Sequence, residues 1–294
     1  MIEKENITGN YDECNKIEEK YLVYMDYFVN KLSQYVDIRD TYYDKNILTL
    51  GIDKGNIINV IEGLFRNELL IADYIITSNK INLYARHNIE NSIYHELLHM
   101  ASSIYDKEKE VRKSGFFEGT KEYSVGYGLD EGYTEYLNIK YFSSERKCYL
   151  YEIIISRLVE LIVSKNKMQK LYFKADLVGL CSSLAGYSTE KSVKNFIFKS
   201  DYILDNGYSI MKTQQVNRYR LDINHYLANT YVNMLIVLYN NKIITSSEVY
   251  NLYHIFMKEL THLLDIPLDI NKDILYENIE GIREMQLYRV KKKV

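Results

Sequence analysis

The sequence is short of several residue types, and each shortage argues against a class of protein. Its 294 residues contain no Trp, one Pro, three Cys and six His. One Pro beside 13 Gly excludes collagen-like chains and proline-rich linkers. The cysteines, Cys14, Cys148 and Cys181, lie far apart without a CxxC pair, so nothing suggests a disulfide framework or a thiolate zinc site. This cysteine usage is typical of the reducing cytoplasm.

Long apolar runs and a basic excess are also missing. The most apolar runs, 151–163 and 234–239, are shorter than the about 18 to 20 residues that span a bilayer. The first residues, Met-Ile-Glu-Lys-Glu-Asn, are polar where a secretory signal has a basic start and an apolar stretch. A net charge of -3 gives no general attraction to nucleic acid or to anionic lipid. We therefore expect a cytoplasmic chain that binds neither nucleic acid nor membrane, and nothing in the sequence indicates its oligomeric state.

What the sequence has is an ordinary core and an excess of tyrosine. Hydrophobic residues make up 47% of the chain and charged residues 26%, which is too apolar for intrinsic disorder. Without the 30 Tyr, the hydrophobic share falls to about 37%, a normal value for a globular protein. The chain should fold, and its tyrosines come in addition to a normal core.

The spacing of apolar residues changes from mixed to helical along the chain. A period of two predicts strands and a period near 3.6 predicts helices. The expected strands are 46–52, 74–77 and 81–86, the last half-buried or at a sheet edge. The expected helices are 15–36, 57–70, 88–105 with Asn88 or Asn91 as N-cap, 129–141, 153–163, 167–184, 192–198, 224–239 and 247–264. Residues 115–128, with four Gly, should form a loop or hairpin, and 202–212 a loop.

These elements predict an α+β fold that is predominantly helical. A mixed α/β lobe over 1–145 should precede a helical lobe over 146–294.

The strongest local motif is His95-Glu96-Leu97-Leu98-His99. Side chains four residues apart share a helix face, so both imidazoles can reach one ion at about 2.0 to 2.1 Å while Glu96 faces a water beside it. With six His in the chain, the pattern arises by accident in about one such chain in a hundred. The spacing therefore predicts a zinc site with a general base.

A catalytic zinc needs one more protein ligand, and the best candidates lie in Gly128-Leu-Asp-Glu-Gly-Tyr-Thr-Glu-Tyr136. Together with the HExxH helix, this segment resembles the gluzincin metallopeptidases, the clan of thermolysin and the zinc aminopeptidases. The resemblance covers about residues 80–142, and the 31 residues between His99 and Glu131 make a longer interval than in thermolysin-like relatives. It implies a zincin-like fold with a small mixed sheet before the HExxH helix and a helical C-terminal lobe that forms the other side of the cleft.

The resemblance also implies roles for individual residues. Glu131 stands at the position of the third zinc ligand, Asp130 where the family often has Asn, and Glu135 where an acidic residue hydrogen-bonds a zinc-bound His. Gluzincins commonly place a His or Tyr beside the reacting carbonyl, and His225, Tyr226 and Tyr133 are the candidates for it. The other residues considered as third ligand are Asp130, His225, His254, His262 and Cys148.

The leading interpretation is zinc-dependent hydrolysis of a peptide or protein substrate, with His95, His99 and Glu131 as ligands and Glu96 as general base. The strand 81–86 could pair with an extended substrate along its edge. Absence of a Gly-x-Met-Glu-Asn run before His95 favours an endopeptidase over an aminopeptidase. The alternatives are a zinc-binding regulatory or binding module without significant turnover, and a helical interaction protein with an accidental motif.

Overall fold

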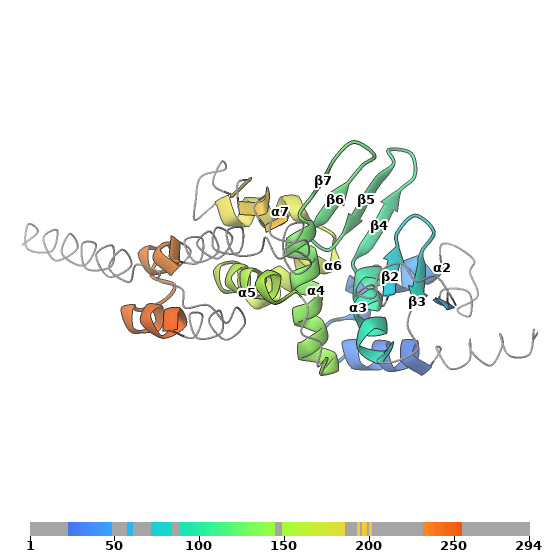
Figure 1. Cartoon of the computed structure of the whole chain (residues 1–294), viewed down its shortest axis with the longest axis horizontal. Helices are drawn as coiled ribbons and strands as arrows, with labels where there is room; N and C mark the ends of the chain where they lie inside the picture. Colours follow the sequence, from blue (N-terminus) through green and yellow to red (C-terminus); the bar gives the residue numbers. More distant parts are fainter. Residues whose placement is uncertain are drawn as a thin grey trace, which may run out of the picture. The chain divides into compact units, whose positions relative to one another are not determined.

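The computed structural model describes the chain over ten ranges of residues. They are 23–48, 58–60, 72–83, 89–144, 149–185, 193–194, 196–198, 200–201, 232–233 and 235–254. Within them the fold is α+β and predominantly helical, as the sequence predicts (Figure 1). No described helix is both long enough and apolar enough to cross a membrane.

Helical residues 23–32 and two short elements come first, and the helical residues and α2 pack against α3 (Ile89–Ala101). The two elements are the 3-10 helix η1 (Ile38–Asp40) and α2 (Tyr43–Leu48). The strand expected from residue 46 is therefore wrong at 46–48, while 49–52 lie outside the described residues. Tertiary contacts explain the difference, because the Asn46 amide donates to the carbonyl oxygens of Met100 and Ser103 at 2.7 and 2.8 Å and holds α2 beside the end of α3.

A three-stranded mixed sheet precedes the HExxH helix. Its strands are β1 (Ile58–Val60), β2 (Ala72–Ile75) and β3 (Lys80–Leu83). They lie in the order β1-β3-β2, with β1 parallel and β2 antiparallel to β3. The helix expected over 57–70 is wrong at 58–60, where Ile-Asn-Val pairs with β3, and 61–70 lie outside the described residues. β2 lies two residues before the strand expected at 74–77.

β3 is not an edge strand, which corrects a sequence prediction. It has a neighbour on each side over the described residues. Its alternating pattern is misleading because polar Asn82 is buried at 5% exposure and donates to Asp73 of β2 at 2.7 Å. A polar residue in a strand need not face water when a residue opposite satisfies it.

The HExxH helix, α3 (Ile89–Ala101), ends four residues earlier than expected. Asn91 lies inside it and is therefore not its N-cap, and Asn88 lies outside the described residues. The hydroxyl of Ser102 donates to the Leu98 carbonyl and that of Ser103 to the His99 carbonyl, so these serines occupy helix-terminal acceptors and the chain turns into a strand.

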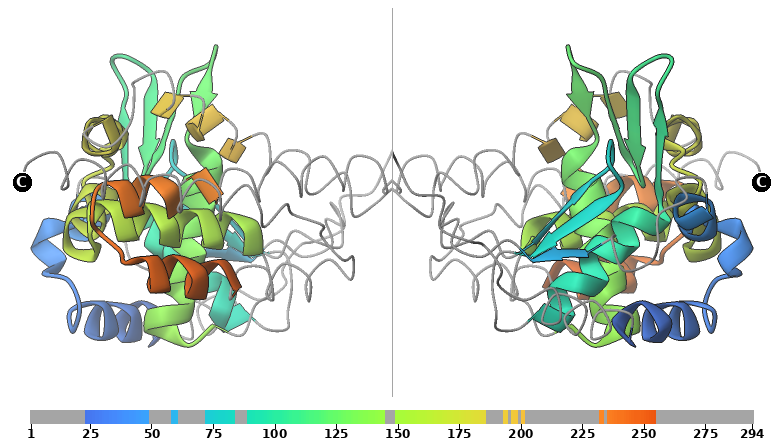
Figure 2. Two further views of the ribbon diagram at one scale, coloured as in Figure 1. Left: turned by 90° about the vertical axis from the view of Figure 1, so that its left-hand side faces the viewer. Right: turned by 90° about the vertical axis from the view of Figure 1, so that its right-hand side faces the viewer.

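A four-stranded antiparallel sheet fills the interval between the two motifs. Its strands, in sequence order and spatial order alike, are β4 (Ser103–Asp106), β5 (Val111–Ser114), β6 (Phe117–Gly119) and β7 (Ser124–Val125). The hairpin alternative for the glycine-rich stretch is confirmed. Figure 2 shows these strands as a ribbon distinct from the strands before α3.

Four helices follow, and they carry most of the remaining described residues. They are α4 (Tyr127–Phe142), α5 (Leu150–Val163), α6 (Lys165–Phe173) and α7 (Leu177–Ala185). The single helix expected over 167–184 is two, because Ala175 adopts a left-handed φ of 50°. The amides of Ala175 and Asp176 donate to Tyr172 and Leu171 carbonyls, the two hydrogen bonds of a Schellman ending.

Later described residues are helical at 193–194, 196–198, 200–201, 232–233, 235–240 and 246–254, within or beside the expected helices. The expected loop at 202–212 lies outside the described residues.

The described residues divide into two compact units. One comprises those within 1–125, 133–148 and 169–177, and the other those within 126–132, 149–168 and 178–294. Helix α4 contributes its first turns to the second unit and its remainder to the first. The division expected near residue 145 and the cleft between two lobes stay predictions.

Candidate metal centre

The HExxH motif lies on the most deeply buried part of α3. Ile93, Leu97, Leu98, Met100 and Ala101 have no exposed surface, and α3 packs on β2 and β3. His95 is 2% exposed and His99 is 7% exposed. The apolar neighbours therefore hold both imidazoles in a place of low dielectric, where a polar group needs partners.

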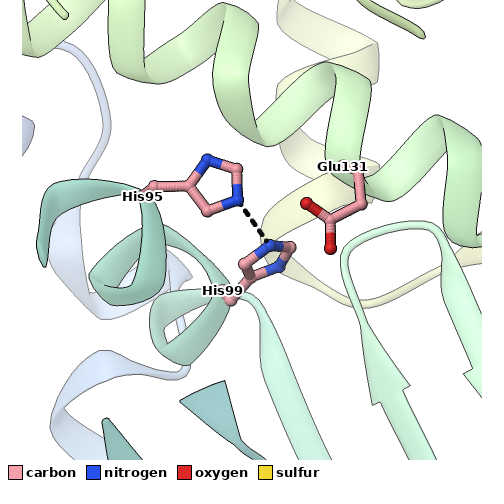
Figure 3. A group of neighbouring side chains, drawn as sticks. All are labelled: His95, His99 and Glu131. Carbon is pink, nitrogen blue, oxygen red and sulfur yellow. Dashed lines mark hydrogen bonds between the residues drawn. The ribbon is translucent and has the colours of Figure 1, made fainter. Parts of the chain in front are cut away.

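His95, His99 and Glu131 form the one group of potential metal ligands found among the described residues. Their candidate ligand atoms all lie within 4.8 Å of one another, and the Nε2 atoms of the two histidines are 3.1 Å apart. Figure 3 shows the rings turned toward each other at these nitrogens, with the Glu131 carboxylate directed toward the pair. Asp130 and His254 are described but do not belong to this group.

Helix α4 carries Glu131 and positions it through its own geometry. Glu135 follows one turn later on the same face, and its Oε2 lies 2.7 Å from Nδ1 of His95. Glu131, one turn before this contact, brings a carboxylate oxygen to within 4.8 Å of a ring nitrogen of each histidine. Asp201 holds the start of the helix, because its carboxylate accepts from the amides of Gly126 and Gly128, both at 2.8 Å.

Glu135 is a fully buried carboxylate with several donors around it. Besides His95, it accepts from the Ser144 hydroxyl at 3.2 Å and from the Asn138 amide at 3.3 Å. The Asn138 amide also donates to the Asn91 carbonyl of α3 at 2.9 Å. When the imidazole N–H donates to this carboxylate, a neutral His95 carries its hydrogen on Nδ1, and its Nε2 lone pair is directed toward His99 and Glu131.

The His99 ring nitrogen that does not face His95 also has a partner. Its Nδ1 lies 3.2 Å from the hydroxyl of Ser114, a buried residue at the end of β5. In each imidazole, Nδ1 therefore contacts a residue that is not a ligand candidate, and Nε2 is directed toward the other ligand candidates.

These residues fit a metal ion of the zinc type. Two imidazoles and a carboxylate are a known donor set of catalytic zinc, and two nitrogens bound at about 2.05 Å in tetrahedral geometry lie about 3.3 Å apart, close to the observed 3.1 Å. Outer partners that fix the imidazole tautomers are typical of metal-binding histidines. His95, His99 and Glu131 could hold the ion, with Glu135 and Ser114 behind the histidines.

The other predicted site residues have different surroundings. Glu96 and Asp130 are buried, at 7% and 1% exposure, next in sequence to the ligand candidates. Tyr133 is fully buried, with its ring packed against those of Phe116 and Tyr172, and it lies about 200° further round α4 than Glu131. His225, Tyr226, His262 and Cys148 lie outside the described residues, and His254 is exposed.

Sequence reasoning missed the partners that lie far away in the chain. Ser114, Asp201 and Glu152 contact or influence the site residues from elements that carry no motif. A lone serine at a strand end or a lone aspartate after a helix has no local pattern that marks it, so only the folded structure identifies them.

Glycine at two positions lets backbones approach α4 closely. An added Cβ at Gly128 would overlap the backbone of Ser200, and one at Gly132 would overlap the backbone of Glu152. The two glycines are one turn apart on the helix. The glycines that flank Glu131 in the sequence therefore serve packing around the ligand-bearing turn.

Replacing Gly132 with Ala should destabilise the protein in spite of the better helix propensity of Ala. The new methyl group meets helix backbone, which cannot rotate away, so the loss should be about 1 to 3 kcal/mol, against a propensity gain of about 1 kcal/mol. Urea unfolding monitored by circular dichroism measures the difference. A variant more stable than the wild type would contradict this packing.

Glu152 of α5 is a buried acid beside this turn. Burial, with a smaller contribution from the negative charge of Glu131, raises its pKa to about 7. The carboxyl is neutral below its ordinary pKa of 4.5 in the folded and the unfolded chain alike. As the pH rises from 4.5 to about 7, the unfolded chain ionises while the folded chain resists, so stability is lost.

A Glu152→Gln variant should therefore be more stable than the wild type at pH 8 by up to about 3 kcal/mol, the equivalent of the pKa shift. The advantage should shrink toward zero near pH 4.5. Denaturant unfolding of both proteins at several pH values tests this, with Glu122→Gln, an exposed change, as control. A difference that does not vary with pH would show that the carboxyl does not titrate as described.

Comparisons with protein-family models, with curated protein sequences and with solved structures found no match to this chain. Function is therefore inferred from the side chains of the site.

Proposed function

We propose that this chain is a zinc-dependent peptidase of the gluzincin type that uses Glu96 as general base. The observation that carries the proposal is the buried group of His95, His99 and Glu131, which offers the donor set of a catalytic zinc site on two helices. Support also comes from Glu96, the neighbour of His95 in the motif. A purely structural zinc site has no use for such a residue.

In this proposal each residue of the site has a separate role in the reaction. When bound, zinc supplies Lewis-acid chemistry, because it polarises a carbonyl group and lowers the pKa of water. A carboxylate oxygen of Glu96 takes a proton from the attacking water and passes it to the leaving amine. Glu135 keeps His95 in the tautomer that presents Nε2. The donor to the developing oxyanion comes from outside this group, with His225 and Tyr226 as the candidates.

An extended substrate would pair with β2, which differs from the strand expected from the sequence. β3 has partners on both sides, whereas β2 is at the edge of the described sheet and packs against α3. Main-chain pairing at a sheet edge gives affinity with little dependence on side chains. This is compatible with an endopeptidase, which binds internal segments of a chain.

Cleavage of a peptide library provides the test. The purified protein should cleave internal peptide bonds, lose activity with a chelator, and recover it when zinc is added back. Mass spectrometry of the products reports the bonds cut and separates internal cleavage from release of terminal residues. No cleavage by the zinc-loaded protein over a broad library would argue against a peptidase.

The second candidate is a zinc-binding module without significant turnover. The low exposure of the site favours it, since Glu96, His99 and Glu131 are each at most 7% exposed and offer a substrate little surface. If this candidate is correct, one zinc ion should bind per chain, but the peptides of the library should not be cleaved. Metal content and cleavage measured on the same preparation distinguish the two candidates.

A further inference from the structure

The four-stranded sheet between the two motifs begins directly beside His99. Its first strand, β4, starts two residues after α3 ends. The Ser103 hydroxyl donates to the His99 carbonyl at 2.5 Å, and the Gly115 amide donates to the Ser102 carbonyl at 2.9 Å. These bonds fasten the β4–β5 hairpin to the last turn of α3.

The pairing register then determines which side chain lies next to the imidazole. Ser114 is opposite Ser103 in the β4–β5 ladder and opposite Phe117 in the β5–β6 ladder. Its hydroxyl is 3.2 Å from Nδ1 of His99, and the residue is 3% exposed. Water therefore has little access to replace this contact.

The turn after Ser114 is anchored to the helix that carries Glu131. Gly115 takes a left-handed φ of 48°, and Phe116, which has no exposed surface, packs its ring against Tyr133 of α4 and Tyr172 of α6. The end of β5 thus contacts both motif helices, through a hydroxyl on one side and an aromatic ring on the other.

We propose that this sheet is part of the metal centre and that Ser114 is a positioning residue, which accepts a hydrogen bond from Nδ1 of His99 and so keeps Nε2 available to the metal. The inference rests on the metal-binding part of the proposed function. The two histidines then have unlike outer partners, a carboxylate for His95 and a neutral hydroxyl for His99. Neither the HExxH motif nor the Glu131 segment contains Ser114.

The proposal predicts a loss of metal affinity in Ser114→Ala. Removing a residue that hydrogen-bonds a metal ligand lowers metal affinity by about 10- to 100-fold. Because Ser114 is a neutral partner, we expect a loss near the lower end of this range. Competition with a chromophoric chelator measures the zinc dissociation constant. Ser114→Thr, which keeps the hydroxyl, should recover much of the affinity, and Ser124→Ala, an exposed change on β7 of the same sheet, should not alter it.

The imidazole itself gives a second readout that a change in general stability would not move. Nitrogen-15 NMR of the zinc-loaded wild type should show His99 with its hydrogen on Nδ1 and its Nε2 free of hydrogen, and Ser114→Ala should shift the resonance of the Nδ1 hydrogen. His95, which keeps Glu135, should not change. Urea unfolding of each variant shows whether the fold is intact.

The outcomes separate this inference from the proposed function. A wild-type chain that binds no zinc overturns both. Zinc binding by the wild type with unchanged affinity in Ser114→Ala overturns the inference alone, and so does a zinc-loaded wild type in which the hydrogen of His99 is on Nε2. If Ser114→Ala does not fold, the tautomer of His99 in the zinc-loaded wild type still decides.

Discussion

Replacing Glu96 with Gln is expected to remove hydrolysis and leave the metal in place. Gln has nearly the same shape but cannot accept a proton from water at neutral pH. Loss of a general base lowers a rate by about 100- to 10,000-fold. Because Glu96 is not among the ligand candidates, zinc stoichiometry should stay at the wild-type value.

The measurement is the turnover of the best library substrate by zinc-loaded protein, together with the metal content of the same sample. Glu90→Gln is the matched control, since Glu90 is an exposed glutamate in the first turn of the same helix. Its turnover should equal that of the wild type. Wild-type turnover by Glu96→Gln would rule out Glu96 as the base.

Replacing Glu131 with Ala should have the largest effect on metal binding. The change removes one of three protein donors, so the affinity should fall by more than the about 10- to 100-fold that loss of an outer partner costs. The charge of Glu131 also contributes to the raised pKa of Glu152, so Glu131→Ala should lower that pKa and reduce the loss of stability of the metal-free fold between pH 4.5 and 7.

Isothermal titration with zinc measures the first effect, and urea unfolding of the metal-free proteins measures the second. Glu122→Ala, an exposed substitution, serves as control for both. Wild-type affinity in Glu131→Ala would mean that the third ligand is a different residue.

His95 and His99 could be predicted from helix geometry, whereas Glu131 and Glu135 could be expected from the resemblance of their segment to the gluzincins. His95 and His99 share a face of α3, and Glu131 and Glu135 share a face of α4, at any position of the two helices. Ser114 and Asp201 could not be expected, because strand register and a distant helix end bring them to the site.

The prediction of local structure failed where tertiary contacts outweigh local preference. Ile58, Asn59 and Val60 form a strand because β3 pairs with them, and Asn82 is buried because Asp73 is opposite. Glycine was informative only in part. Gly115 does lie at a hairpin turn, but Gly128 and Gly132 lie inside α4, where the backbones of Ser200 and Glu152 approach the helix.

The excess of tyrosine has a structural explanation over part of the chain. Tyr133 and Tyr172 pack with Phe116, and Tyr94 packs with Phe142 and with the partly exposed Tyr27. These rings fill space between helices where other proteins use aliphatic residues. A tyrosine near the motif is thus more readily explained by packing than by catalysis. The residue that acts as proton donor is therefore to be identified by mutagenesis.

Metal analysis of the purified protein tests the central claim most directly. After dialysis against zinc and removal of the excess, inductively coupled plasma mass spectrometry should find one zinc ion per chain. The double variant His95→Ala/His99→Ala, prepared in the same way, should contain none. A folded wild-type chain without zinc, or equal zinc in both proteins, would contradict a metal centre at His95, His99 and Glu131.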